Sequence, residues 1–347
     1  MKQPETHTRE IVKFILAHVS LHPKDITSFT AANFGLTRQA ILKHLKRLIE
    51  ENSLLVKGKT KDRTYALKLI ADYSKEFFSV GLEEDKIWRE EVRPLLPDVP
   101  PNVLTICEYG LTEMINNVID HSEGSKVCVE LKYDLDKIQL RVTDNGVGIF
   151  KKIQSKFGLD DLRHAILELS KGKLTTDPEH HTGEGVFFTS RMFDFFGILS
   201  NNLFFAHNTD GNDWLLETDT SRGDETGTMI VMKVSPYSTR TVQSVFNAYA
   251  NADGDFGFSK THIPVALAKY GDENLVSRSQ AKRLLARVDR FEEIDFDFKG
   301  VETIGQAFAD EVFRVFQRQN PQIHLHPINA NEQVQGMISR AINQQVS

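Results

Sequence analysis

The motif at residues 144–149, DNGVGI, follows directly on residues 137–143, where apolar and polar side chains alternate. Alternation with a period of two is typical of a half-buried strand, so we expect Asp144 at a strand end. A carboxylate at that position can accept a hydrogen bond from an amino group. Gly146 and Gly148 let the backbone approach a flat ring, because glycine has no Cβ. The alternative interpretation is an ordinary Asp-Asn-Gly turn in a loop.

A second motif is a group of polar side chains on one face of a helix expected at residues 102–122; its members are Glu113, Asn117, Asp120 and His121. An amide oxygen suits Mg²⁺, which takes oxygen ligands, and a carboxylate one helical turn away can hold a water for attack. The alternative for this motif alone is a solvated helix face.

A third motif occurs at residues 181–188, HTGEGVFF, immediately before a helical segment that runs to residue 195. Gly183 and Gly185 would open that helix, where exposed backbone N–H groups and the helix dipole attract phosphate. One Gly-x-Gly is also an ordinary flexible turn. The three motifs in this order, however, together predict a nucleotide site.

With these motifs, residues 100–235 resemble the GHKL superfamily, which includes gyrase, heat-shock chaperones, histidine kinases, the mismatch-repair protein MutL and the anti-sigma-factor kinases. The resemblance implies a Bergerat-type α/β sandwich, with helices on a mixed sheet, that binds ATP and Mg²⁺. It implies that Glu113 is the general base and Asn117 the Mg²⁺ ligand. Residues 151–182 correspond to the mobile ATP lid. The other nucleotide-binding residues expected are Asp120, His121, Asp144, Gly146, Gly148, Gly183, Gly185, Val186 and Thr228.

Residues 1–70 are predicted to form a winged helix-turn-helix, with helices at 9–19, 26–34 and 38–51 and strands at 54–56 and 64–67. This segment carries 13 Lys and Arg against 6 Asp and Glu, whereas the remainder carries 29 against 42. A basic unit on an acidic body predicts DNA binding by the first 70 residues; the alternative is a helical dimerisation domain. Expected contacts to bases or phosphates are Arg38, Gln39, Lys43 and Arg47, and expected backbone contacts are Lys57, Lys59, Lys61 and Arg63.

The rest of the chain is divided by composition and periodicity. Residues 71–101 are expected to be a linker helix and a Pro-rich loop, 102–240 the ATP-binding domain, and 241–273 a connector. Residues 274–347 resemble STAS-like domains related to anti-sigma-factor antagonists, on the motifs IDFDFKGV at 294–301 and FADE at 308–311. The predicted fold class is therefore multidomain α/β.

Phosphorylated relatives of these STAS-like domains have a serine that opens the helix after that strand. Here Gly305, Gln306 and Ala307 occupy the position, and Thr303 is nearby. The departure counts against phosphorylation of this domain. It leaves two interpretations, a signalling domain that binds a protein partner and a small α/β packing domain.

The sequence has no stretch approaching the roughly 18 apolar residues of a membrane span, and its first ten residues are polar. We therefore expect a cytoplasmic protein without a membrane partner, and we expect it to form a homodimer. Cys107 and Cys128 are too few for a disulfide scaffold and are expected to be buried thiols.

Four functions are compatible with these motifs to different degrees. The first is an ATP-gated DNA-binding transcriptional regulator with slow or no hydrolysis, which uses all three regions. The alternative is a serine/threonine kinase of the anti-sigma-factor type that acts on a STAS-domain partner. A histidine kinase needs a phosphoacceptor helix hairpin, and neither His44 nor His121 suits that role. A gyrase-like clamp needs a transducer domain with a catalytic lysine, and residues 275–347 resemble a STAS-like domain instead.

Overall fold

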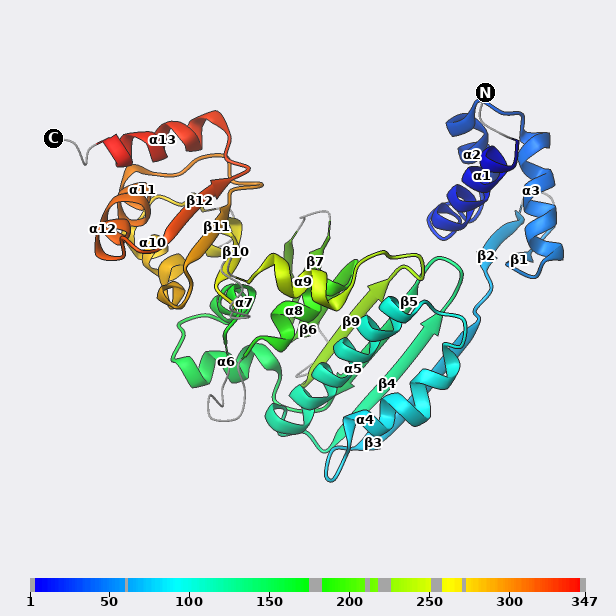
Figure 1. The fold of residues 1–347 in the computed structure, drawn as a ribbon, viewed down its shortest axis with the longest axis horizontal. Helices are drawn as coiled ribbons and strands as arrows, with labels where there is room; N and C mark the ends of the chain where they lie inside the picture. The colour runs from blue at the N-terminus through cyan, green and yellow to red at the C-terminus, as the bar shows by residue number, and fades with distance from the viewer. Residues whose placement is uncertain are drawn as a thin grey trace.

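The computed structural model describes residues 4–59, 62–174, 183–209, 213–217, 226–250, 258–269 and 273–343. Figure 1 shows three units along the chain, with the first at one end of the molecule and the C-terminal unit at the other. No helix within these ranges is long and apolar enough to cross a membrane.

The N-terminal unit consists of three helices followed by a two-stranded antiparallel hairpin, in the order that the sequence predicts. Gly35 ends the second helix in the left-handed conformation, and Thr37 caps the third by accepting a hydrogen bond from the Ala40 N–H at 3.2 Å. Its apolar core is separate from that of the other units. The elements are α1 (Pro4–His18), α2 (Ile26–Phe34), α3 (Arg38–Glu50), β1 (Leu54–Lys57) and β2 (Thr64–Leu67).

The central unit is built on a seven-stranded sheet in the order β3-β4-β5-β9-β6-β7-β8. Along the central strands β5 and β9 every second side chain is buried in the core, and the others are half-buried. Asp144 and Thr228 occupy buried positions in this alternation. The strands are β3 (Ala71–Phe78), β4 (Lys126–Tyr133), β5 (Ile138–Asp144), β6 (Phe195–Ser200), β7 (Leu203–Asn208), β8 (Trp214–Glu217) and β9 (Thr228–Val234).

The expectation of a mixed sheet is wrong, because every described pair of neighbouring strands in this sheet is antiparallel. The reason is the position of β9, which is inserted between β5 and β6 and runs antiparallel to both. The helical connection from β5 to β6 therefore joins two strands of the same direction that are not hydrogen-bonded to each other.

Helices cover one face of this sheet, and α5 runs across it (Figure 1). Pro101 opens α5 at a position where its missing N–H costs nothing. The helices of this unit are α4 (Glu84–Lys86), η2 (Ile87–Val92), η3 (Arg93–Leu95), α5 (Pro101–His121), α6 (Ile149–Phe157), α7 (Leu162–Lys171), α8 (Gly185–Met192) and α9 (Val242–Ala248).

The expected linker helix is wrong for residues 71–78, which form β3 and pair with β4 from Ala71↔Tyr133 to Phe78↔Lys126. Ala71, Tyr73 and Phe77 pack against the core at a period of two, and the intervening positions are exposed. The segment is an edge strand, and charged residues on an edge strand weaken its apolar pattern.

The expected connector at residues 241–273 also needs correction. α9 packs on α5 and α8, whereas β10 (Lys260–Pro264) is the first strand of the C-terminal sheet. That sheet is parallel, in the order β10-β11-β12, so the C-terminal unit begins before residue 274. The remaining elements are η4 (Val265–Ala268), α10 (Arg278–Leu285), η5 (Val288–Arg290), β11 (Glu293–Asp297), α11 (Gln306–Asp310), η6 (Glu311–Phe316), α12 (Gln317–Gln319), β12 (His324–Ile328) and α13 (Glu332–Asn343).

The central and C-terminal units share one continuous apolar core. At their junction the rings of Phe187 and Phe258 lie 4.6 Å apart between centroids. Cys107 is buried, and burial raises the pKa of its thiol to about 12. Cys128 is only half-buried, which corrects the expectation of two buried thiols.

Candidate functional site

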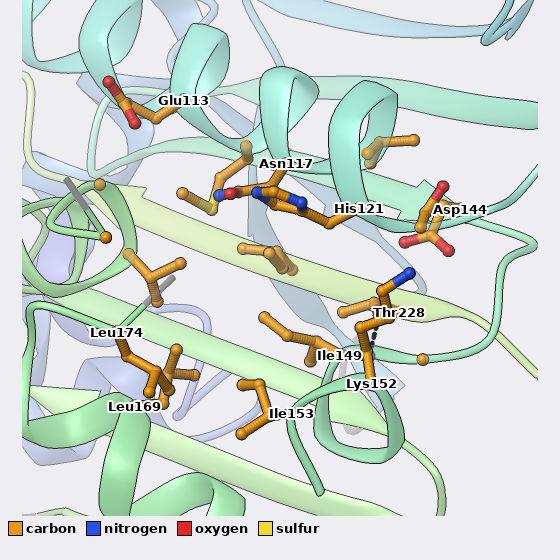
Figure 2. A pocket seen from close by; sticks show the side chains of 18 of the residues that line it. Glu113, Asn117, His121, Asp144, Ile149, Lys152, Ile153, Leu169, Leu174 and Thr228 are labelled. Carbon is orange, nitrogen blue, oxygen red and sulfur yellow. Dashed lines mark hydrogen bonds between the residues drawn. The ribbon is translucent and has the colours of Figure 1, made fainter. Parts of the chain in front are cut away.

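A cavity of about 280 Å³ lies between α5, the ends of β5 and β9, and helices α6 to α8. Figure 2 shows Glu113, Asn117 and His121 along α5 on one side, with Ile149, Lys152, Ile153, Leu169 and Leu174 on the other. Nine of the predicted site residues line it: Glu113, Asn117, His121, Asp144, Gly148, Gly183, Gly185, Val186 and Thr228.

Two predicted site residues do not line the cavity. Asp120 is exposed on α5, because the cavity faces the part of the helix that carries Asn117 and His121. Gly146 lies beside the site, and a Cβ there would collide with the Ser122 carbonyl oxygen. Its N–H donates to Asp144 Oδ1 at 2.7 Å, so Gly146 shapes the turn that holds the carboxylate.

Asp144 occupies the last inward position of β5 and is 9% exposed. Burial raises the pKa of its carboxyl group, while hydrogen bonds from Gly146 and Thr228 oppose that shift. Thr228 Oγ1 also accepts a hydrogen bond from the Ile149 N–H at 3.0 Å, which ties the start of α6 to β9. The arrangement holds one carboxylate and one hydroxyl side by side at the floor of the cavity.

Asn117 is the strongest indication that the cavity takes a polar ligand. Its Nδ2 is buried and has no hydrogen-bond partner among the described residues, although buried amides are normally satisfied. A rotation of the amide exchanges Nδ2 and Oδ1, so the side chain can present either a donor or an Mg²⁺ ligand. Its chemistry therefore fits both a phosphate and the ion that accompanies it.

Glu113 lies one turn before Asn117 and meets the beginning of α8. A Cβ on Gly185 would collide with Glu113 Oε2, so any other residue there would force the Glu113 carboxylate to move. Gly183 has φ +73°, in the left-handed region that favours glycine. The backbone at the start of α8 therefore comes close to the Glu113 carboxylate.

Several lining residues were not predicted from the sequence. Lys152 on α6 lines the cavity and forms an ion pair with Glu123. In the sequence it is one of several lysines on an amphipathic helix, which gives no local signal for a site. The other lining residues that were missed are Met114, Val118, Ser122, Ile149, Ile153, Leu169, Leu174, Glu184 and Ile230.

The segment expected to be the ATP lid begins with two helices, α6 and α7. Gly158 ends α6 in the left-handed conformation, and the Asp161 side chain caps α7 by accepting from the Arg163 N–H at 2.7 Å. Residues 175–182 of this segment lie outside the described residues.

The candidate nucleic-acid interface is the exposed surface of α3 and the hairpin. The predicted contacts that the structure describes are all exposed: Arg38, Gln39, Lys43, Arg47, Lys57, Lys59 and Arg63. Arg47 pairs with Glu51 through Nε and Oε1 at 2.6 Å. Lys61 lies outside the described residues.

The chain was compared with known proteins and protein families. A model of the histidine kinase-, DNA gyrase B- and HSP90-like ATPase matches residues 107–193, which supports ATP binding. A model of a STAS-like domain of unknown function, DUF4325, matches residues 280–335.

Similar curated proteins include the sensor protein VraS of Staphylococcus haemolyticus and of Staphylococcus aureus, each 41% identical over 59 residues. The matched segment is 16% of this chain and only 17% of the length of each relative. With the family matches, these comparisons confirm the predicted resemblance for two regions. Residues 107–193 belong to a GHKL-type ATPase domain, and residues 280–335 belong to a STAS-like domain.

Proposed function

We propose that this protein is an ATP-gated, DNA-binding transcriptional regulator that hydrolyses ATP slowly or not at all. The observation that carries the proposal is the short connection between the basic N-terminal unit and the nucleotide domain. β2 ends at Leu67 and β3 begins at Ala71, and the Ile70 N–H donates to the Tyr133 carbonyl at 2.6 Å. A movement of the sheet edge is therefore transmitted to the N-terminal unit without a flexible linker.

The DNA-binding part of the proposal rests on charge and exposure. The first 70 residues carry 13 basic against 6 acidic side chains, and Arg38 and Lys43 are exposed on α3. Lys57, Lys59 and Arg63 lie on or beside the hairpin, where they are suited to contact phosphates. We expect the active form to be a cytoplasmic homodimer, since two copies would present two such units to DNA.

The nucleotide part assigns roles to residues of the cavity. Asp144 and Thr228 would hold the adenine, Asn117 the Mg²⁺ ion, and Gly183, Gly185 and Val186 the phosphates. Bound MgATP supplies a triphosphate that water can cleave, and Glu113 is placed to orient that water. The unpartnered, buried Asn117 Nδ2 supports this assignment.

Thermodynamic reciprocity tests the proposal. If ATP gates DNA binding with a coupling of about 1–3 kcal/mol, ATP must change DNA affinity, and DNA must change ATP affinity, by the same factor of about 5–150. Both titrations use the Glu113→Ala protein, which should hold ATP without consuming it. Two affinities that stay within about twofold, or roughly 0.4 kcal/mol, would contradict gating.

The DNA-binding surface has its own test. Arg38→Ala should weaken DNA binding by about 1–3 kcal/mol if Arg38 contacts a base, or reduce the salt dependence if it contacts a phosphate. Arg89→Ala is the matched control, because Arg89 is exposed on η2 in the central unit. If the two substitutions change DNA affinity equally, α3 does not contact DNA.

A second candidate function is a serine/threonine kinase of the anti-sigma-factor type with a STAS-domain partner. The observation in its favour is that the STAS-like region packs directly on α7, in the lid segment of the ATP site. Gly305, Gln306 and Ala307 stand at the start of α11, so the target would be a serine of another protein. Incubation with γ-labelled ATP and a STAS-domain protein separates the functions: label on protein supports the kinase, and free phosphate an ATPase.

A further inference from the structure

A second and larger cavity, of about 810 Å³, lies between the central and C-terminal units. It is lined by residues from α8, β7 and the segment around α9, and by the ends of β10 and β11. None of its lining residues belongs to the nucleotide cavity. Its volume falls in the range of sites for small organic molecules.

The position of this cavity in the C-terminal unit is typical of a ligand site. β10, β11 and β12 are parallel, and the cavity is lined by Pro264 and Asp297, the last residues of β10 and β11. In open parallel sheets flanked by helices, ligands bind in the crevice outside the carboxyl ends of the strands. Gly300, with φ +73°, follows β11 and also lines the cavity, so the turn there brings backbone to its wall.

The charge of the lining favours an anion. Three cationic side chains, Arg191, Arg240 and Lys299, line the cavity together with two carboxylates, Asp213 and Asp297. Both carboxylates have protein partners. Asp213 accepts a hydrogen bond from His207 Nδ1, and Asp297 accepts from His262 Nε2 at 3.2 Å, from Asn329 Nδ2 at 2.9 Å and from the Lys299 N–H at 2.9 Å.

Arg191 lines this cavity and has one unused, buried donor. Its Nη1 donates to Ser190 Oγ at 2.9 Å, and its guanidinium lies 4.7 Å from the centroid of the Phe187 ring. Its Nη2 is buried without a hydrogen-bond partner among the described residues. A buried cationic donor without a partner is costly, and an oxyanion would satisfy both its charge and its N–H group.

His207 adds an acceptor to the same wall. Burial and the nearby Arg191 lower the pKa of its imidazole, although Asp213 opposes the shift. A neutral ring whose Nδ1 donates to Asp213 leaves Nε2 as an acceptor. A phosphate ester offers both complementary groups, since it has several acceptor oxygens and, in its monoanionic form, one O–H donor.

We propose that this second cavity is a binding site for a small phosphate ester, with its phosphate on Arg191 and its organic part toward the ends of β10 and β11. Lys299 adds positive charge to the lining, whereas the charge of Arg240 is paired with Asp194 at 3.1 Å. The cavity is far larger than a bare phosphate requires. The site is distinct from the ATP site and does not depend on the function proposed above.

Histidine rings provide a separate reporter for each cavity. His207 and His262 line the second cavity, whereas His121 lines the nucleotide cavity. Ribose 5-phosphate is titrated into the full-length protein with ¹⁵N-labelled histidine, with ribose as the uncharged control, and the ring signals are followed by NMR. The proposal expects the His207 and His262 signals to shift with ribose 5-phosphate and to stay unchanged with ribose.

Substitutions then identify the anion contact. Arg191→Gln should weaken binding by about ten- to a hundredfold, the effect of losing a hydrogen bond to a charged group. Arg89→Gln, on the exposed face of η2, should bind like the unchanged protein. Lys299→Gln, just after the end of β11, is a second variant in case Arg191→Gln does not fold. It is also expected to weaken binding.

Three outcomes would overturn the proposal. One is the absence of any shift in the His207 and His262 signals at saturating ribose 5-phosphate. Another is a shift confined to His121, which would place the ligand in the nucleotide cavity. The third is unchanged affinity in folded Arg191→Gln and Lys299→Gln proteins, because the phosphate would then not lie at the cationic wall.

Discussion

The contact between α7 and the C-terminal unit includes a buried charge network centred on Lys171. Lys171 is 1% exposed and Glu168 is 4% exposed. Lys171 Nζ donates to Glu168 Oε1 at 2.8 Å and to the carbonyls of Ala286 and Arg283 at 2.8 and 3.1 Å. The Arg287 guanidinium binds the other oxygen of Glu168 at 2.9 Å.

Lys171→Met removes the ammonium group and retains much of the side-chain volume. It leaves the half-buried Ala286 carbonyl without this donor, at about 1–3 kcal/mol, whereas the Arg283 carbonyl still accepts from the Ala286 N–H and Glu168 keeps Arg287. Relief of the desolvation of the ammonium offsets part of this cost. The net expectation is a loss of about 1–3 kcal/mol of unfolding free energy, less than for a buried charge left unpaired, because Glu168 keeps Arg287.

Urea unfolding followed by the fluorescence of Trp88, which is 5% exposed in the central unit, measures the change. Hydrogen exchange of the α7 amides shows whether the loss is concentrated at the contact. Lys282→Met is the matched control on exposed α10 and should change stability by less than about 0.5 kcal/mol. If Lys171→Met and the control are equally stable, the network does not hold the two units together.

Three further predictions concern the ATP site. Gly185→Ala should displace the Glu113 carboxylate from the start of α8, because its Cβ would collide with Glu113 Oε2, and should therefore lower any hydrolysis measured as phosphate release; unchanged turnover would contradict the close approach. Glu113→Ala should retain ATP binding and lower the rate of any hydrolysis, measured as phosphate release, by a factor of about 10²–10⁴. A turnover equal to that of the unchanged protein would show that Glu113 is not the general base. Asp144→Asn should greatly weaken ATP binding, since the amide also presents donors to the adenine. Burial raises the pKa of Asp144 above the ordinary 3.8. The carboxyl group is therefore fully ionised, and able to accept hydrogen bonds with both oxygens, only at pH values well above that raised pKa. ATP affinity should therefore fall on acidification already above pH 3.8, and Asp144→Asn should lack this dependence.

The ATP site illustrates how much of the chemistry could be predicted locally. Glu113 and Asn117 are one helical turn apart, and Asp144 ends an alternating strand, so short-range periodicity placed them on known faces. Lys152 was missed because a lysine on an amphipathic helix has the same appearance whether it faces solvent or a cavity. Only the position of α6 across the cavity from α5 distinguishes the two.

The sequence by itself determined the local elements: the three helices and hairpin of the N-terminal unit, the long helix α5, and the strands that end at the glycine motifs. These follow from side-chain period, caps and turns within about ten residues of chain. Sequence motifs also indicated the GHKL-type and STAS-like regions, which the family comparisons confirm.

Tertiary structure alone decided which distant segments became neighbours. It placed β3 at the edge of the ATPase sheet and β9 between β5 and β6, and it assigned β10 to the C-terminal sheet. It also buried Lys171 against the carbonyls of Arg283 and Ala286 and left Arg191 facing a second cavity. Strand pairing depends on partners tens of residues away, and the burial of Lys171 depends on carbonyls more than a hundred residues away. The pattern of a single segment reflects only its own periodicity.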